Sequence, residues 1–276
     1  MAPRFITVAE VRTIVGITDS QISDGDVEDI IEDVEYQIER YYNTVFKPKE
    51  EIEVLDGNGK HVIFVNNAPL LAVREIKDDG VTIDVKKINF SNSGRIRLTN
   101  FSTVANFRDK ENGLIVSYVY GRVIFPEGGP ETKLTADATS GSNVVLNVGA
   151  ITGFAQNDWI EIYGVDGNKE VAKINTAPAG LTIQVDKLVF DHVSTSFIRK
   201  LDIPVIIKRL MKISSALAMV ARIVGQSFDD IVGYTMGEFQ VQKGEPYTQW
   251  RETALELIKE RDEILQRVHP TATILM

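Results

Sequence analysis

The sequence predicts an α+β protein: a helical bundle with β-hairpins, plus an inserted all-β barrel or sandwich domain. Near both ends of the chain, apolar residues recur every three or four positions, which is the period of a helix with one buried face. Between the ends, apolar and polar residues alternate, as they do in half-buried strands. Residues 132–200 are rich in Thr, Val, Ile, Asn and Gly and have no helical period, which indicates a small β-domain.

We therefore predict two domains. Residues 1–131 and 201–276 form a discontinuous helical-bundle domain with β-hairpins, and residues 132–200 form the inserted small β-domain. The flanking segments PEGGPE and LDIP are suitable insertion points because both contain proline and lie between predicted elements.

The first predicted elements are two helices. A short helix over residues 7–16 has Thr7 as its N-cap and ends at Gly16. A longer helix runs from about Asp24 to Tyr42. Its apolar stripe consists of Val27, Ile30, Ile31, Val34, Ile38 and Tyr41. Its opposite face is strongly acidic. A solvated helix face is the usual meaning of such a charge run.

Strands follow. Residues 51–65 predict a hairpin with its turn at Asp56 to Gly59, and residues 71–83 predict a second hairpin with its turn at Asp78 to Gly80. Residues 95–98 and 114–120 are further strands. The sequence 132–200 predicts five or six short strands.

Two helices complete the chain. Ile203 to Val224 has one narrow polar stripe and ends at Gly225, so we expect it to be covered on most sides. A last helix runs from about Tyr247 to Val268 and is stopped by Pro270. Its apolar stripe comprises Trp250, Ala254, Leu257, Ile258, Ile264, Leu265 and Val268.

Composition narrows the function classes. The net charge of −9 argues against tight DNA binding, since DNA-binding domains usually carry a basic face. The chain has no cysteine, which excludes disulfides and thiolate chemistry. No apolar run is long enough for a membrane span, and the N-terminus lacks the apolar core of a signal peptide. We expect an intracellular protein, or one released without secretion, that has no contact with a membrane.

Nothing in the sequence forms a catalytic constellation. The acidic segment at residues 19–30 fails the EF-hand pattern. With Gly25 as the loop glycine the first ligand position is Ser20, and the third and twelfth would be Ile22 and Ile31, which have no ligand oxygen in their side chains. The segments DGNGK and VDGNK are better interpreted as hairpin turns than as phosphate loops. The three histidines are widely separated. We therefore predict no catalytic residue, no metal ligand and no cofactor.

Two other functions remain possible for this sequence, carbohydrate or surface binding and nuclease activity. Trp159 and Tyr163 alternate on one predicted strand and could stack on a sugar, which would make the chain a carbohydrate- or surface-binding protein acting through the β-domain. Glu131 and Lys133 could end a nuclease-like carboxylate–lysine motif, although the sequence reveals no companion acid.

The order of elements resembles a known family. The segments ITVAEVRTIVGI, DGDVEDIIEDVEYQIERYYNTVF, LIVSYVYG and IPVIIKRLMKISSALAMVARIV, together with the glycine-containing IVGYTMGEFQVQKGE, are similar to head–tail connector (adaptor) proteins of long-tailed phages and related archaeal viruses. The resemblance covers about residues 5–125 and 201–268. Residues 132–200 depart from the family pattern. Through TGFAQNDWIEI, LTIQV and FDHVSTSFI they resemble a small β-domain of several phage structural proteins.

The resemblance implies a structural role without a reaction. Such adaptors assemble as a homo-oligomeric ring, typically of twelve subunits, beneath the portal protein. The ring extends the channel through which double-stranded DNA passes without specific binding, and it offers a platform to a stopper or tail-terminator protein. The implied location is the neck of the virion, after assembly in the host cytoplasm. Another neck or tail-completion protein with a similar ring role is the nearest alternative.

Three sets of contact residues follow as hypotheses. The candidate portal-docking residues are His269, Pro270, Ile274, Leu275 and Met276, because apolar terminal residues are otherwise exposed to water. The candidate lumen-facing residues are Asp26, Glu28, Asp29, Glu32, Asp33 and Glu35, because a negative wall repels phosphates. The candidate subunit-interface residues are Lys208, Lys212, Ser215, Arg222 and Trp250.

Overall fold

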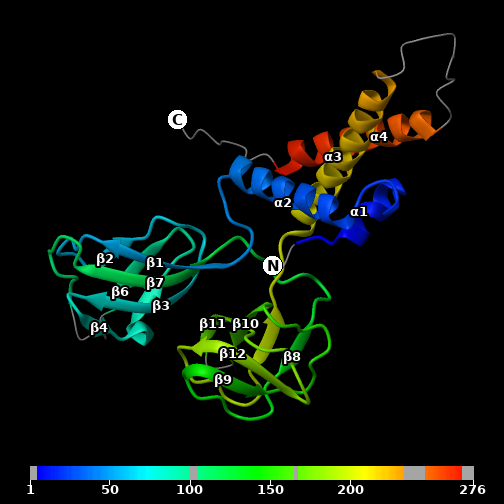
Figure 1. Cartoon of the computed structure of the whole chain (residues 1–276). Coiled ribbons are helices and arrows are strands. Elements are labelled where there is room, and N and C mark those ends of the chain that lie inside the picture. The colour runs from blue at the N-terminus through cyan, green and yellow to red at the C-terminus, as the bar shows by residue number, and fades with distance from the viewer. Residues whose placement is uncertain (1–4, 100–104, 165–166, 233–245, 269–276) are drawn as a thin grey trace, which may run out of the picture. The chain divides into compact units, whose positions relative to one another are not determined.

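A computed structural model of the chain describes residues 5–99, 105–164, 167–232 and 246–268 (Figure 1). Its contacts divide the chain into two compact units. The helical unit joins Met1–Asn43 with Val205–Met276, and the β unit is Thr44–Pro204. None of the described helices is long and apolar enough to span a membrane. The mixture of helices with antiparallel sheets confirms the predicted α+β class.

The helical unit begins with two capped helices, α1 (Val8–Val15) and α2 (Asp24–Tyr41). Thr7 caps α1 and Gly16 follows its last residue, as predicted. The cap is a capping box with Glu10, and Gly16 has a left-handed conformation. Ser23 caps α2 by accepting a hydrogen bond from the Asp26 amide at 3.2 Å. The predicted apolar stripe of α2 is buried except for Tyr41, which is 56% exposed in the last turn.

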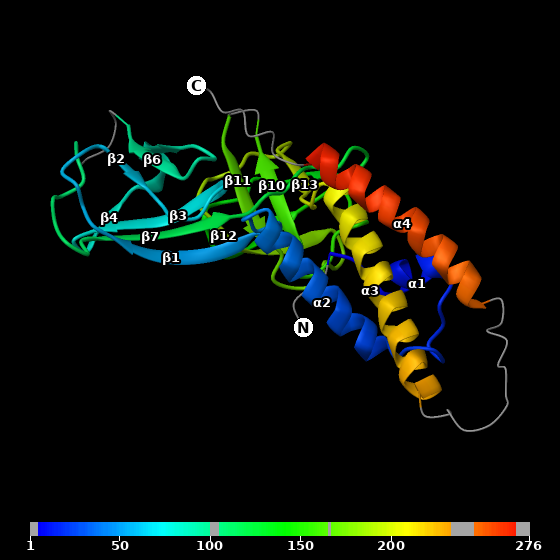
Figure 2. The same cartoon turned by 90° about the horizontal axis from the view of Figure 1, so that it is seen from above.

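The two C-terminal helices are α3 (Val205–Val232) and α4 (Pro246–Val268). Helix α3 contacts α1, α2 and α4, so it is the central element of the helical unit. In Figure 2 it lies between α2 and α4. The prediction that Gly225 ends this helix is wrong, because α3 continues to Val232. A single glycine inside a helix costs only about 1 kcal/mol, which the contacts of a long central helix can offset.

The first part of the β unit contains two sheets. Its elements are β1 (Lys49–Leu55), β2 (Val62–Phe64), β3 (Leu70–Asp78), β4 (Val81–Ile83), the 3₁₀ helix η1 (Val85–Lys87), β5 (Ile88–Phe90), β6 (Arg95–Leu98) and β7 (Leu114–Tyr120). Sheet A has the order β1-β7-β3-β4, and sheet B has the order β2-β6-β5. All of these pairs are antiparallel.

The hairpin predicted over residues 51–65 is wrong, whereas the hairpin predicted over residues 71–83 is confirmed. Strand β1 pairs with β7 and strand β2 pairs with β6, so the segment from Asp56 to Gly59 connects two sheets. Glycine is required at position 57 because the backbone at Arg108 lies very close to it. A Cβ at this position would lie 1.8 Å from the Arg108 carbonyl oxygen. In the second hairpin, β3 pairs directly with β4 across the turn at Asp79 and Gly80.

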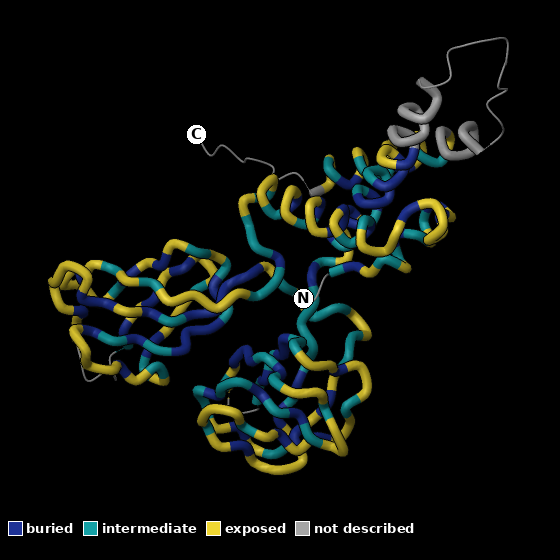
Figure 3. Tube along the Cα trace, in the orientation of Figure 1, coloured by how far each residue is buried: buried dark blue, intermediate teal, exposed yellow. Residues whose placement is uncertain are grey.

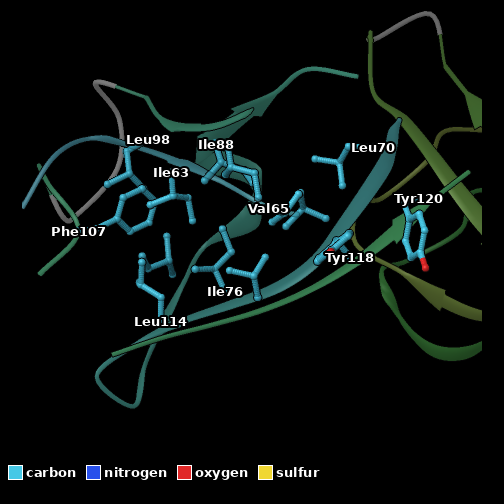
Figure 4. Packing of buried hydrophobic residues seen from close by; sticks show 14 residues of the cluster. Ile63, Val65, Leu70, Ile76, Ile88, Leu98, Phe107, Leu114, Tyr118 and Tyr120 are labelled. Atoms are coloured by element: carbon cyan, nitrogen blue, oxygen red, sulfur yellow. The ribbon is translucent and has the colours of Figure 1, made fainter. Parts of the chain in front are cut away.

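Sheets A and B enclose an apolar core (Figure 4). The inward residues of β3 and β7, including Ile76, Leu114 and Tyr118, pack against Ile63 and Ile96 of sheet B. The Tyr118 hydroxyl donates to the Glu53 carboxylate at 2.8 Å and accepts from the Asn67 amide at 2.9 Å. Burial raises the pKa of Tyr118 to about 12, so its phenol stays protonated at neutral pH.

The second part of the β unit follows the predicted strands. These are β8 (Glu131–Lys133), β9 (Gly141–Asn147), β10 (Trp159–Tyr163), β11 (Lys169–Lys173), β12 (Thr182–Leu188) and β13 (Phe197–Lys200). They form a sheet of order β11-β10-β13-β8, which we call sheet D, and a two-stranded sheet β12-β9. The described strands form no closed barrel. The interpretation of VDGNK as a hairpin connection is confirmed by the pairing of β10 with β11.

The two parts of the β unit are packed on each other. Ala72 and Val119 of sheet A share a buried cluster with Trp159 and Val171. The Arg74 guanidinium, whose side chain is 1% exposed, binds the Asp186 carboxylate at 3.0 Å and the Lys187 carbonyl at 2.9 Å. Sheet A is therefore held against sheet D by an apolar contact, and against β12 of the two-stranded sheet by a partly buried ion pair. The prediction that residues 1–131 and 201–276 form one domain, into which residues 132–200 are inserted, stays a prediction.

Candidate assembly surfaces

The acidic residues of α2 separate into two groups. Asp26 pairs with Arg222 of α3, and the Glu35 carboxylate accepts the Phe5 amide at 2.9 Å. Glu28 is also half-buried. Asp29, Glu32 and Asp33 are exposed, and their spacing places them on the side of α2 opposite its buried stripe. Figure 3 shows that exposed positions recur along α2. Of the six candidate lumen-facing residues, these three form an outward acidic face.

The polar stripe of α3 pairs with acids on the other helices. Lys212 binds Glu10 of α1 at 2.6 Å. Arg222 binds Asp26 of α2. Arg209 binds Glu260 of α4 through two hydrogen bonds of 2.7 and 2.8 Å. The candidate interface residues Lys212 and Arg222 therefore form ion pairs inside the subunit, and Lys208 is half-buried beside them.

These pairs shift the pKa values of their acids. Burial raises the pKa of Glu10, but the hydrogen bonds from Lys212 and from the Thr7 amide outweigh it and leave that pKa lowered. The hydrogen bond from Arg209 lowers the pKa of Glu260 despite partial burial. Both carboxylates are stabilised in the charged form by cations of α3.

Ser215, another candidate interface residue, is fully buried within the helical unit. Its hydroxyl has no hydrogen-bond partner among the described atoms. A side chain with no exposed surface is inaccessible to a neighbouring subunit in this conformation. Ser215 therefore contributes to the contacts of α3 inside its own subunit.

The other candidates lie outside what the structure describes. The portal-docking residues His269, Pro270, Ile274, Leu275 and Met276 follow the last described residue, and the side chain of Trp250 in α4 is likewise outside the described set.

The residues considered for sugar stacking are occupied by contacts within the protein. Trp159 is 8% exposed and lies in the cluster with Ala72, Val119 and Val171. The Tyr163 ring stacks on Phe197 with centroids 5.1 Å apart, and the Arg199 guanidinium lies over Tyr163 at 4.0 Å. The two aromatic side chains therefore offer no open pair of ring faces for a sugar.

The residues considered for nuclease chemistry also have structural contacts. Glu131 binds Arg199 at 2.7 Å, and the Lys133 ammonium lies 4.5 Å from the centre of the Phe197 ring. Within the described ranges, no group of three or more His, Cys, Asp or Glu side chains could hold a metal ion.

Sequence reasoning missed one exposed surface. On the outer face of sheet B, Phe64 is 63% exposed and lies opposite Arg95, while Arg97 is opposite Val62 and Asn89. The alternation RIRL at residues 95–98 could have revealed this surface, because Ile96 and Leu98 are buried and both arginines are exposed on the opposite face of the strand.

A comparison with protein-family models matches residues 4–128 to the head completion protein family. The matched stretch includes α1, α2 and both sheets of the first part of the β unit, and it ends before β8. No curated protein matches the chain.

Proposed function

We propose that this chain is a structural protein of the head–tail neck of a tailed virus, and more specifically an adaptor that forms a ring at the portal. The observation that carries the proposal is the match of residues 4–128 to the head completion protein family. The ring would extend the DNA channel and present a platform to the next neck or tail protein. No chemical reaction is required for this role.

The helical unit supports the proposal by its electrostatics. Asp29, Glu32 and Asp33 are exposed and form an outward acidic face on α2, while the cations of α3 bind acids on α1, α2 and α4. We propose that these three residues line the channel, where negative charge repels the phosphates of passing DNA. A ring map in which they point away from the channel would contradict this assignment.

The C-terminal residues 269–276 remain our candidate for docking into the portal. Deleting them should abolish portal binding while leaving the melting temperature of the subunit unchanged. Binding at full strength after the deletion would exclude the tail as the docking element.

The test of the proposed function is the mass of the purified protein in solution, alone and mixed with its cognate portal, by light scattering. Electron micrographs of each peak give the symmetry of the assembly. A subunit that forms a ring on the portal supports the adaptor role. A protein that remains monomeric and does not bind the portal contradicts it.

A further inference from the structure

The outer face of sheet B is an apolar and cationic surface without a partner in the described structure. Phe64 lies directly across from Arg95, and the exposed side chains of Arg95 and Arg97 share its face. Their inner neighbours Ile63 and Ile96 are buried, so this orientation is fixed by the core. Neither arginine forms an ion pair with a described residue. Such a face fits a partner that presents carboxylates around an apolar side chain.

The chain itself contains a surface of this kind on α4. Leu255 is 57% exposed, although it belongs to a helix whose Leu257 and Ile264 are buried. Glu252 and Glu256 are exposed on either side of it and pair with no described cation. Lys259 is the next charged residue of α4 after Glu256, and it is also exposed. This face therefore combines an exposed leucine with two carboxylates that pair with no described cation, and the exposed Lys259, four residues after Leu255, lies beside them.

The spacing of the charges on the two faces is similar. Residues four apart on a helix are separated by about 6 Å along its axis, as are Glu252 and Glu256. Residues two apart on an antiparallel strand are separated by about 6.8 Å, as are Arg95 and Arg97. When Leu255 packs on Phe64, each carboxylate can reach one guanidinium, which is a strong and geometrically selective contact.

We propose that the Phe64–Arg95–Arg97 face of one copy binds the Glu252–Leu255–Glu256 face of α4 in the next copy. The two faces differ, so the contact is heterologous and can propagate around a closed ring. This inference rests on the proposed ring function and names the surfaces that would join its subunits. A stable interface buries roughly 800 Å² of surface on each partner, and two faces of three residues each bury much less. The contact should therefore be weak in solution and should form when the portal brings copies together.

The absence of cysteine allows a direct test, because each introduced thiol is the only one in its chain. Arg97→Cys protein and Glu256→Cys protein are mixed, assembled on the cognate portal and oxidised. A disulfide-linked dimer that contains one chain of each kind is expected. As a matched control, Val145→Cys, at an exposed position on β9, replaces Arg97→Cys and should give no such dimer.

Charge reversal tests the same contact without a cross-link. The pair Arg95→Glu and Arg97→Glu, or the pair Glu252→Arg and Glu256→Arg, should raise the protein concentration needed for assembly by about tenfold or more, because like charges then meet. A chain that carries all four changes restores opposite charges and should recover assembly. All four positions are exposed, so the melting temperatures should remain close to that of the natural protein.

The outcomes separate the two proposals. A ring that forms without the mixed cross-link, and that tolerates both charge reversals, overturns this interface and leaves the adaptor role intact. No assembly of the unmodified protein on the portal contradicts the adaptor role itself.

Discussion

At the scale of single residues, ion pairs between the helices account for side chains that sequence periodicity alone leaves ambiguous. Lys212 and Arg222 lie on the polar stripe of α3, yet each is paired with a carboxylate of another helix. A polar stripe on a helix is compatible with a solvent-exposed face, with a subunit interface or with contacts between helices of the same subunit. The positions of Glu10 and Asp26 decide between these cases.

Glu10→Gln should reduce the stability of the helical unit at neutral pH by less than about 1 kcal/mol, since the pair with Lys212 is partly screened by solvent. The folded-state pKa of Glu10 is lowered, so the stabilisation is fully present above the unfolded glutamate value of about 4.3. It is lost as the pH falls through the lower folded-state value. Melting temperatures of both proteins from pH 7 to pH 3 should converge at the acid end. A constant difference over this range would contradict the assignment.

Gly57→Ala should destabilise the β unit by several kcal/mol, because the new methyl group would meet the Arg108 carbonyl oxygen at 1.8 Å. Urea unfolding followed by circular dichroism measures the change. Gly80→Ala is the informative comparison. Nothing lies within 4 Å of a Cβ there, so its cost arises only from the left-handed backbone at φ +80°.

At the scale of elements, the two parts of the β unit are joined through β3 and β12. Strand β3 contributes Arg74, and β12 contributes Asp186 and Lys187. Asp186 also accepts the Lys173 amide of β11 at 2.9 Å, so one carboxylate orders two strands and the guanidinium. The contact is a fixed part of the fold of both segments.

Arg74→Met should cost about 2–4 kcal/mol, because it leaves Asp186 and the Lys187 carbonyl without their partner while retaining much of the side-chain volume. The measurement is the free energy of unfolding from urea titration. Arg95→Met, on the exposed face of sheet B, is the matched control and should change the stability by less than about 0.5 kcal/mol. Equal effects of the two changes would contradict a buried anchoring role for Arg74.

At the scale of the whole molecule, the segment 132–200 has the sequence features of an insertion, yet it packs on sheet A. Its ends meet, since the Lys200 amide donates to the Pro130 carbonyl at 3.0 Å. The match to the head completion protein family ends at residue 128, close to this junction. Yet Trp159 and Val171 cover Ala72 and Val119 of the matched part.

Joining Pro130 to Leu201 through a short Gly–Ser linker therefore tests how far the rest of the chain depends on this segment. Removal should lower the melting temperature by roughly 5 °C or more, because it exposes the apolar patch at Ala72 and Val119 of sheet A and removes the Asp186 partner of Arg74. Differential scanning calorimetry gives the value. An unchanged transition would show that the segment is an independent decoration.

Local patterns in the sequence were sufficient for the α+β class and for the existence of the four helices and most strands, but not for the end of α3 or for β5. Caps such as Thr7 and Gly16, and alternation such as that of residues 95–98, depend on neighbours a few positions away, so the sequence alone determined them. The pairing of β1 with β7, the burial of Ser215 and the pairing of Lys212 with Glu10 join residues far apart in the chain. These contacts depend on how whole elements pack, because many pairings satisfy the same local pattern, and only the tertiary structure decided among them.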